Sequence, residues 1–158
     1  MKTLDYTKLN GAAAAQTVKS LQQLLADFQV FYTNLRGFHW NVKGKNFFQL
    51  HARFEEMYDN TAEKVDEIAE RILMLDGVPA HNFSAYLSTN KVKETGVVSD
   101  GDAALKNVLE TLSLLMESEK AVLAAAAEAG DEVTVAMMSD YLKEQEKTTW
   151  MLTAYFSN

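Results

Sequence analysis

The chain is built around one stretch, HARFEEMYDNTAEKVDEIAERILML, which runs from His51 to Leu75. Its apolar residues recur every three or four positions, which predicts a single long helix with one face in a hydrophobic core. The residues of that apolar face are Leu50, Phe54, Met57, Thr61, Val65, Ile68, Ile72 and Leu75. A second face carries His51, Glu55, Asp66 and Glu70, which fall within an arc of about 100° at 3.6 residues per turn. We therefore expect this helix to point a line of histidine and carboxylate side chains away from its own core.

The spacing of these polar residues predicts two half-sites. His51 and Glu55 are neighbours at i and i+4, and Asp66 and Glu70 form a second such pair. The two pairs begin about 22 Å apart along the helix axis, whereas a bond from a metal ion to its ligand is only about 2 Å long. One metal site can use both pairs only if a second copy of the helix lies antiparallel to the first. A twofold axis between two chains produces this arrangement and places one pair opposite the other. The alternative interpretation is a solvated charged face that also contains a histidine.

Composition limits the class of protein. A chain of 158 residues, 47% hydrophobic and 23% charged, is typical of one globular domain, here residues 1–158. One proline and only seven glycines favour an all-helical protein. The absence of cysteine excludes disulfides and thiol chemistry. Neither a secretory signal nor a transmembrane helix is expected, because the start lacks an apolar region and no apolar run is long enough to span a membrane. The absence of cysteine fits the cytoplasmic location that we expect. The net charge of −7 argues against a general nucleic-acid binder and suits a protein that gathers cations.

The sequence before this stretch predicts a helix over about residues 12–41, followed by a tight connection. Asn46 and Gln49 resemble a capping box that opens the second helix. A connection this short makes the two helices antiparallel neighbours. It also brings His39, near the end of the first helix, close to His51, near the start of the second.

The sequence after this stretch predicts a long crossover and two more helices. Gly77 is a plausible stop for the second helix, and residues 77–99 then form a connection in which apolar residues within 83–87 predict one short helix. A crossover of this length allows the second and third helices to run parallel. The third helix is expected over about residues 99–129 and the fourth over about 131–156. The predicted fold is an all-α, ferritin-like four-helix bundle with one long crossover.

Several common site motifs are absent from the sequence. It contains no glycine-rich phosphate loop, no G-x-S-x-G and no H-E-x-x-H. It also lacks the Glu-x-x-His pairs from which a di-iron site inside one four-helix bundle is normally built. A metal site in this protein therefore depends on the interface between two chains.

Three blocks of sequence resemble the Dps family, the DNA-binding proteins from starved cells. They are FHWNVKG at Phe38–Gly44, NFFQLH at Asn46–His51 and DEIAER at Asp66–Arg71. The resemblance extends over almost the entire chain, including the four-helix layout and the long crossover. It implies a homododecameric shell of four-helix subunits with ferroxidase sites at the twofold interfaces.

The resemblance also implies a ligand set and a reaction. At each interface two iron ions are expected, bound by His39, His51 and Glu55 of one subunit and by Asp66 and Glu70 of its partner. Many members of the family have aspartate where this chain has Glu55, so the longer side chain is expected to alter metal position or affinity. The implied reaction is Fe(II) oxidation, with hydrogen peroxide as the preferred oxidant. Ferric oxyhydroxide is then stored inside the shell, which protects the cell and its DNA from oxidative stress.

Other residues have an implied role and a simpler alternative. Trp40 matches an aromatic residue that the family has beside the site. Without the resemblance, Trp40 is interpreted as a core or interface residue and His39 as a core histidine. Asp131 and Asp140 are candidates for pores through which Fe(II) enters, or else are ordinary helix-start and surface charges. A rival function is a nucleoid protein that coats DNA, and a third is a scaffold shell with vestigial metal sites. DNA binding is expected to be weak or absent, because the chain has few basic residues near its ends.

Overall fold

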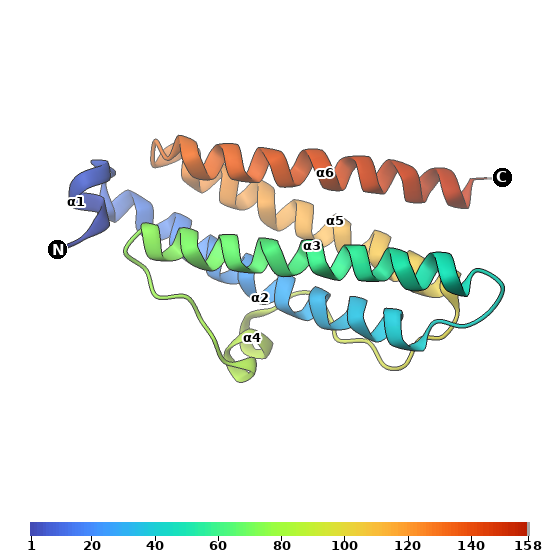
Figure 1. Cartoon of the computed structure of the whole chain (residues 1–158). Helices are drawn as coiled ribbons and strands as arrows, with labels where there is room; N and C mark the ends of the chain where they lie inside the picture. The colour runs from blue at the N-terminus through green and yellow to red at the C-terminus, as the bar shows by residue number, and fades with distance from the viewer. Residues whose placement is uncertain (158) are drawn as a thin grey trace.

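The computed structural model describes residues 1–157, which are helical or irregular and contain no strand; Asn158, the last residue of the expected domain, lies outside this range. Four long helices form a bundle, and two short ones lie at its periphery (Figure 1). The helices are α1 Thr3–Thr7, α2 Gly11–Asn41, α3 Phe47–Met74, α4 Phe83–Thr89, α5 Gly101–Glu128 and α6 Glu132–Phe156. The predicted all-helical, ferritin-like architecture is confirmed.

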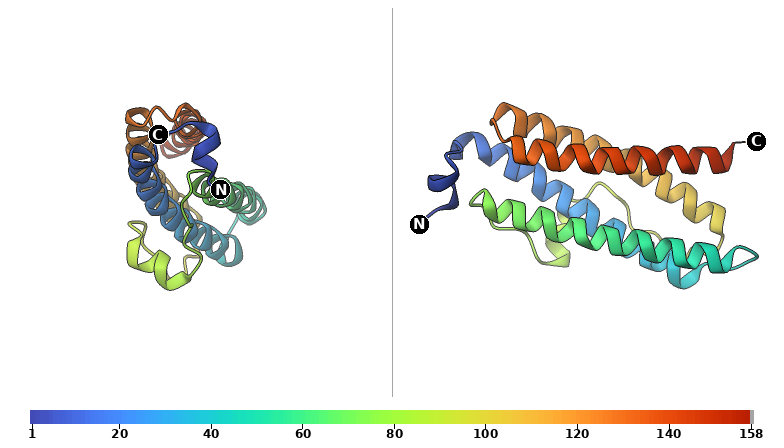
Figure 2. Two further views of the ribbon diagram at one scale, coloured as in Figure 1. Left: turned by 90° about the vertical axis from the view of Figure 1, so that its left-hand side faces the viewer. Right: turned by 45° about the horizontal axis from the view of Figure 1, so that its top comes forward.

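The crossover between α3 and α5 determines the direction of the helices. It returns along the length of the bundle, so that α3 and α5 run parallel, while α2 and α6 run the opposite way (Figures 1 and 2). The short helix α4 sits on this crossover and packs against the outer side of α2. Within residues 1–157, no helix has the length and hydropathy needed to cross a membrane.

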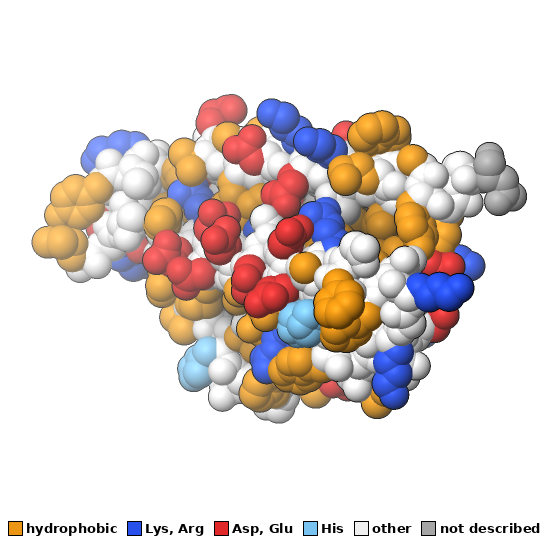
Figure 3. Space-filling view, turned by 45° about the vertical axis from the view of Figure 1, so that its right-hand side comes forward, with side chains coloured by type: hydrophobic (Ala, Val, Ile, Leu, Met, Phe, Trp, Pro, Cys, Tyr) orange, Lys and Arg blue, Asp and Glu red, His pale blue; other side chains and the backbone are white. Residues whose placement is uncertain are grey.

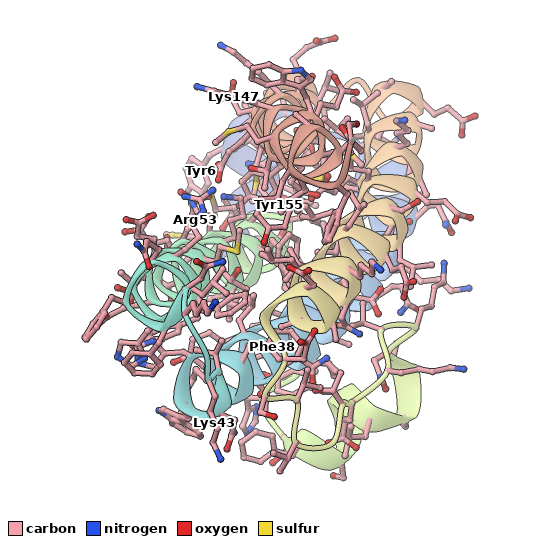
Figure 4. The ribbon with its side chains drawn as sticks, turned by 90° about the vertical axis from the view of Figure 1, so that its right-hand side faces the viewer. Tyr6, Phe38, Lys43, Arg53, Lys147 and Tyr155 are labelled. Atoms are coloured by element: carbon pink, nitrogen blue, oxygen red, sulfur yellow. The ribbon has the colours of Figure 1, made fainter. Side chains whose placement is uncertain are left out.

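The core is drawn from all four long helices. Its largest fully buried apolar side chains are Phe28, Phe38, Phe54, Leu21, Leu24, Leu25, Leu35, Ile68, Ile72, Leu115 and Met138. Figure 4 shows Phe38 inside the bundle, whereas Lys147 lies at its outer surface. The carboxyl group of Glu119 on α5 is also fully buried, and it accepts a hydrogen bond from Gln145 on α6. Burial raises the pKa of Glu119 to about 8, and the hydrogen bond from Gln145 opposes this shift only in part.

The ends of α2 and α3 differ in part from the sequence prediction. At the start of α2, the Asn10 side chain accepts hydrogen bonds from the N–H groups of Ala12 and Ala13 and caps the helix. The capping box predicted at Asn46 and Gln49 is wrong, because the Asn46 side chain makes no capping hydrogen bond. The Asn46 backbone, at φ −96° and ψ 17°, is not in the extended conformation from which a capping side chain reaches the helix.

The end of α3 is closed by Asp76 as well as by Gly77. Asp76 adopts the left-handed conformation at φ 59°, and the Gly77 N–H donates to the carbonyl of Ile72 at 2.9 Å. Gly77 is required for a different reason: a Cβ there would lie 2.8 Å from side-chain atoms of both Ile72 and Val18.

The Asp76 carboxylate also holds α1, a helix that the sequence did not predict. It accepts hydrogen bonds from the N–H groups of Thr3 and Leu4, at 2.8 and 3.1 Å. Burial opposes ionisation of this carboxyl group, but these backbone hydrogen bonds outweigh it and lower the pKa of Asp76. The polar start of the chain is therefore docked on the end of α3.

The surfaces of α3 and α6 face each other across a seam joined by polar side chains. Four side-chain pairs cross this α3–α6 seam: Arg71 with Asp131, Arg71 with Thr134, Glu67 with Tyr141, and Lys64 with Glu144. Between these bridges the seam opens into grooves lined by residues of both helices. The groove at the outer edge of this seam is lined in part by Glu70, which belongs to the second predicted half-site.

Candidate metal centre

Two histidines from different helices form the centre of the first half-site. His39 lies in the last turns of α2 and is only 8% exposed, and His51 lies near the start of α3. Their rings are stacked, with centroids 3.7 Å apart and planes inclined by 19°. The short connection between α2 and α3 thus brings the two histidines together, as the sequence predicted.

Each ring is fixed by the backbone of the other histidine. His39 Nδ1 lies 2.8 Å from the carbonyl oxygen of His51, and His51 Nδ1 lies 2.8 Å from the carbonyl oxygen of His39. A carbonyl oxygen only accepts, so each Nδ1 must carry the proton and donate. In the neutral rings, Nε2 of each histidine is then left with a free lone pair, which is the form that binds a metal ion.

The His39 carbonyl is available because of where α2 ends. The last carbonyls of a helix have no partner within it, and the N–H of Lys43 donates to the carbonyl of Ser99 at 3.0 Å. Aromatic rings bracket the histidine pair: Tyr58 lies edge-on to His39 at 5.3 Å, and Phe47 stacks on His51 at 5.0 Å. The orientation of both imidazoles is therefore set by the fold.

Two carboxylates follow His51 along α3, and an aromatic residue follows His39 in α2. Glu55 is exposed one turn along α3 from His51, and Asp59 is exposed one turn further. Burial, followed by the charges of Glu55 and Asp59, raises the pKa of Tyr58. Trp40 is 63% exposed and lies under the Arg36 guanidinium at 4.6 Å, so it is not a core residue of this subunit.

The second half-site lies towards the other end of α3. Asp66 and Glu70 are both exposed there, and α3 is unbroken from Phe47 to Met74. The separation of about 22 Å that follows from the rise of an unbroken helix therefore applies. Acidic side chains gather on one face of the molecule, beside a histidine and hydrophobic side chains (Figure 3).

Neither half-site is complete within one chain. Among residues 1–157, no three histidine, aspartate or glutamate side chains come together in a cluster that could hold a metal ion. The five predicted ligands are thus placed as a histidine pair with one nearby carboxylate, and a separate pair of carboxylates.

The two predicted pore residues have different environments. Asp140 is exposed on α6 and lines a groove of the α3–α6 seam together with Glu70. Asp131 is only 2% exposed, forms an ion pair with Arg71 at 2.6 Å and caps α6 by accepting hydrogen bonds from Thr134. The charge of Asp131 is buried and neutralised in the single chain, which favours the alternative of a helix-start residue, and its pore role stays a prediction.

Comparison with known proteins places this geometry in a family. A family model described as a ferritin-like domain matches residues 18–158. A protein of Porphyromonas gingivalis named DNA protection during starvation protein is 52% identical over 154 residues, which cover 98% of this chain and 97% of that protein.

The chain belongs to the Dps family. Solved Dps structures superimpose closely on it. The Dps protein of Vibrio cholerae O1, described as a member of a superfamily of ferritin-like diiron-carboxylate proteins, has a TM-score of 0.92 at 45% identity and 94% coverage of both chains. The Dps protein of Bacillus brevis has a TM-score of 0.89 at 32% identity, covering 92% of this chain and 98% of that one.

Several features of this Dps chain have no clear sequence signal. The hydrogen bonds that fix the histidine rings depend on backbone carbonyls, which sequence patterns do not report. Tyr58 is two turns beyond His51 on α3, a spacing shared by many core residues. The bridges of the α3–α6 seam join residues 60 to 80 positions apart, so no local motif indicates them.

Proposed function

We propose that the protein is an iron-storing ferroxidase, which oxidises Fe(II) with hydrogen peroxide and holds ferric oxyhydroxide inside a homododecameric shell. The observation that carries this proposal is the presence of two incomplete half-sites, one towards each end of the unbroken helix α3, with His39 of α2 beside the first. A twofold axis that pairs two antiparallel copies of α3 brings the histidine pair of one chain to the carboxylate pair of the other.

Relatives support this proposal. Similar proteins bear the name DNA protection during starvation protein, and the similar Vibrio cholerae structure is described as belonging to the ferritin-like diiron-carboxylate proteins. Imidazole nitrogens together with carboxylate oxygens are ligands that suit Fe(II). Iron here is the substrate and the stored product.

Each residue has a defined task in the proposed reaction. His39 and His51 present Nε2 to Fe(II), held in orientation by their Nδ1 hydrogen bonds, and Glu55 adds a carboxylate. The partner subunit's Asp66 and Glu70 complete the site and balance the charge of two ions. Hydrogen peroxide takes one electron from each of two Fe(II), its O–O bond breaks, and two hydroxides form.

Two further residues are assigned roles in the same proposal. Trp40, exposed on one subunit and adjacent in sequence to His39, lies beside the completed site at the interface. Asp140 contributes to the negative potential that draws Fe(II) towards the shell, as exposed carboxylates do for cations. The longer side chain of Glu55, compared with the aspartate common in the family, places its carboxylate further from α3.

Mixed shells provide a direct test of the interface site. Subunits carrying His39→Ala and His51→Ala, and subunits carrying Asp66→Ala and Glu70→Ala, should each be inactive alone. When the two kinds are co-expressed in equal amounts, half of the twofold pairs are mixed, and each mixed pair has one intact site of two. We therefore expect about a quarter of wild-type peroxide-dependent Fe(II) oxidation, as the twofold symmetry dictates. Mixed shells as inactive as the parents would refute the interface assignment.

DNA binding is not part of the proposed function. The net charge is −7, and the start of the chain is docked as α1 through Asp76, so it is not a free basic tail. Neutralisation of DNA phosphates by lysine and arginine supplies most non-specific affinity. A gel-shift experiment at low salt is expected to show no retarded DNA, and retardation by the purified protein would contradict this.

A further inference from the structure

A groove on the opposite side of α2 from the histidine pair has a different chemical character. It lies between α2, α5 and the crossover that follows α4, and its volume is about 310 Å³. The residues that give it this character are Lys19 and Gln23 of α2, Lys91 of the crossover and Ser118 of α5. Lys19 is about 30 Å from His39 along the axis of α2 and about 160° around it. This groove, called the lysine groove below, is therefore separate from the candidate metal centre.

The lysine groove is positively charged, although the protein has a net charge of −7. Among the described residues that line it, two are lysines and none is an aspartate or a glutamate. Both lysines are exposed, and the ion pairs within residues 1–157 include neither of them. Two ammonium groups without a carboxylate partner in this part of the chain create a local positive potential, which attracts anions.

A buried hydroxyl group also lines the lysine groove. Ser118 is only 5% exposed, yet its hydroxyl forms no hydrogen bond with any group of residues 1–157. By contrast, Ser139 of α6 donates its hydroxyl to the carbonyl of Val135 at 2.9 Å. A buried polar group without a partner costs free energy, and a ligand in the groove can supply the missing acceptor. Ser118 thus offers a third donor beside the two lysines.

The acceptor groups next to the groove already have donors of their own. The carbonyl of Thr89, at the end of α4, accepts from Gln23 Nε2 at 2.7 Å. The Asp27 carboxylate is 1% exposed and accepts from Gln23 Nε2 and from the N–H groups of Lys91 and Val92. These bonds hold the crossover against α2. They also use both hydrogens of the Gln23 amide, so only its Oε1 is available to a ligand.

We propose that the lysine groove binds inorganic phosphate, as the dianion that keeps one P–O–H group. Lys19, Lys91 and Ser118 donate to its oxygens from three separate elements, which suits a tetrahedral anion better than a planar carboxylate. Its P–O–H group donates to Gln23 Oε1, which a sulfate ion cannot do. At about 30 Å³ per water molecule the groove has room for roughly ten waters, so phosphate fits with part of its hydration shell.

Calorimetric titration of the assembled, iron-free protein measures this binding. Wild type should bind inorganic phosphate in a saturable way, and it should bind sulfate at least about tenfold more weakly. The double variant Lys19→Gln/Lys91→Gln and the single variant Ser118→Ala should each weaken phosphate binding by about tenfold or more, because each loses a hydrogen bond to a charged ligand. The midpoint of thermal unfolding should rise with phosphate concentration in wild type, because the ligand binds the folded state.

Ser113→Ala and Lys147→Gln are the matched controls. Ser113 is exposed on α5, about 140° around the helix from Ser118, and Lys147 is exposed on α6. Both variants should bind phosphate as wild type does. Alanine is a good helix former, so Ser118→Ala should remain folded, and size-exclusion chromatography confirms that each variant assembles.

Three results would overturn the proposal. They are no saturable phosphate binding by wild type, unchanged affinity in both groove variants, and sulfate bound as tightly as phosphate. Duplex DNA titrated in the same way separates the free ion from a phosphodiester, which has no P–O–H group at neutral pH. Binding of the duplex by wild type but not by Ser118→Ala, without binding of free phosphate, would assign the groove to nucleic acid instead. Because no iron is present, these outcomes are independent of the ferroxidase function.

Discussion

Replacing Asp131 with alanine should remove two stabilising interactions at once. The carboxylate is buried in an ion pair with Arg71, which is itself only 8% exposed. Loss of one partner from such a pair leaves a buried, uncompensated charge and costs about 3–5 kcal/mol. The same change removes the cap of α6, worth about 1 kcal/mol. We expect Asp131→Ala to lower the free energy of unfolding by about 4 kcal/mol, allowing for incomplete additivity of neighbouring effects.

The assay is equilibrium unfolding in urea or guanidinium at one fixed protein concentration, because subunit association contributes to the apparent stability. Asp140→Ala is the matched control, since Asp140 is an exposed aspartate on the same helix. Asp140→Ala should lower the free energy of unfolding by no more than about 0.5 kcal/mol, as other surface substitutions do. The double variant Arg71→Met/Asp131→Asn removes both charges while asparagine still caps α6, so its stability should be within about 1 kcal/mol of wild type.

The reasoning would be refuted by two results. One is a decrease of less than about 1 kcal/mol in the free energy of unfolding for Asp131→Ala, because solvent-exposed ion pairs contribute no more than this. The other is a double variant no more stable than Asp131→Asn alone. Either result would show that the Asp131 carboxylate is hydrated in the assembled protein, which would favour its predicted pore role.

Three further substitutions have expected outcomes. The pKa of Glu119 is about 8 in the folded protein and 4.5 ordinarily, so between these pH values only the folded state holds the proton. As the pH rises through this range, the free energy of unfolding of wild type should fall by about 1.4 kcal/mol per pH unit relative to Glu119→Gln. A pH-independent difference in unfolding curves contradicts this. Gly77→Ala should lower the free energy of unfolding by about 1–3 kcal/mol through overpacking. Gly37→Ala is the control, because its Cβ meets nothing within 4 Å, and it should raise the free energy of unfolding by about 0.5–1 kcal/mol. Equal effects of the two substitutions would argue against the close approach at Gly77. Asp76→Ala should speed amide hydrogen exchange in α1, and unchanged exchange rates there would show that α1 does not depend on this carboxylate.

The four long helices could be predicted because hydrophobic periodicity reports them directly. The stretch around Phe54 and Ile68 repeats its apolar residues over many turns, and both side chains are fully buried in the structure. The proximity of His39 and His51 followed from the short connection between their helices. Periodicity and connection length were sufficient for the architecture and for the place of the histidine pair.

The remaining details depend on contacts between distant parts of the chain. The helix α1 has five residues, and the group that caps it, Asp76, comes more than 70 positions later. The sequence shows Asp131 as an acid at a helix start, but its partner Arg71 is 60 positions away. At Asn46 the residue types match a capping box, but the backbone turn that precedes α3 directs the side chain elsewhere. Local patterns cannot report such tertiary constraints.

The mutual hydrogen bonds of His39 and His51 have a consequence for repeated use of the site. Each imidazole has one nitrogen committed to a backbone carbonyl, so neither ring can join two ions as a bridging ligand, and any bridge between ions requires a carboxylate. Since folding alone sets the rings in place, an arriving ion loses none of its binding free energy to the ordering of these two side chains. In the proposed iron-storing function, emptying and refilling this half-site would therefore need no local refolding.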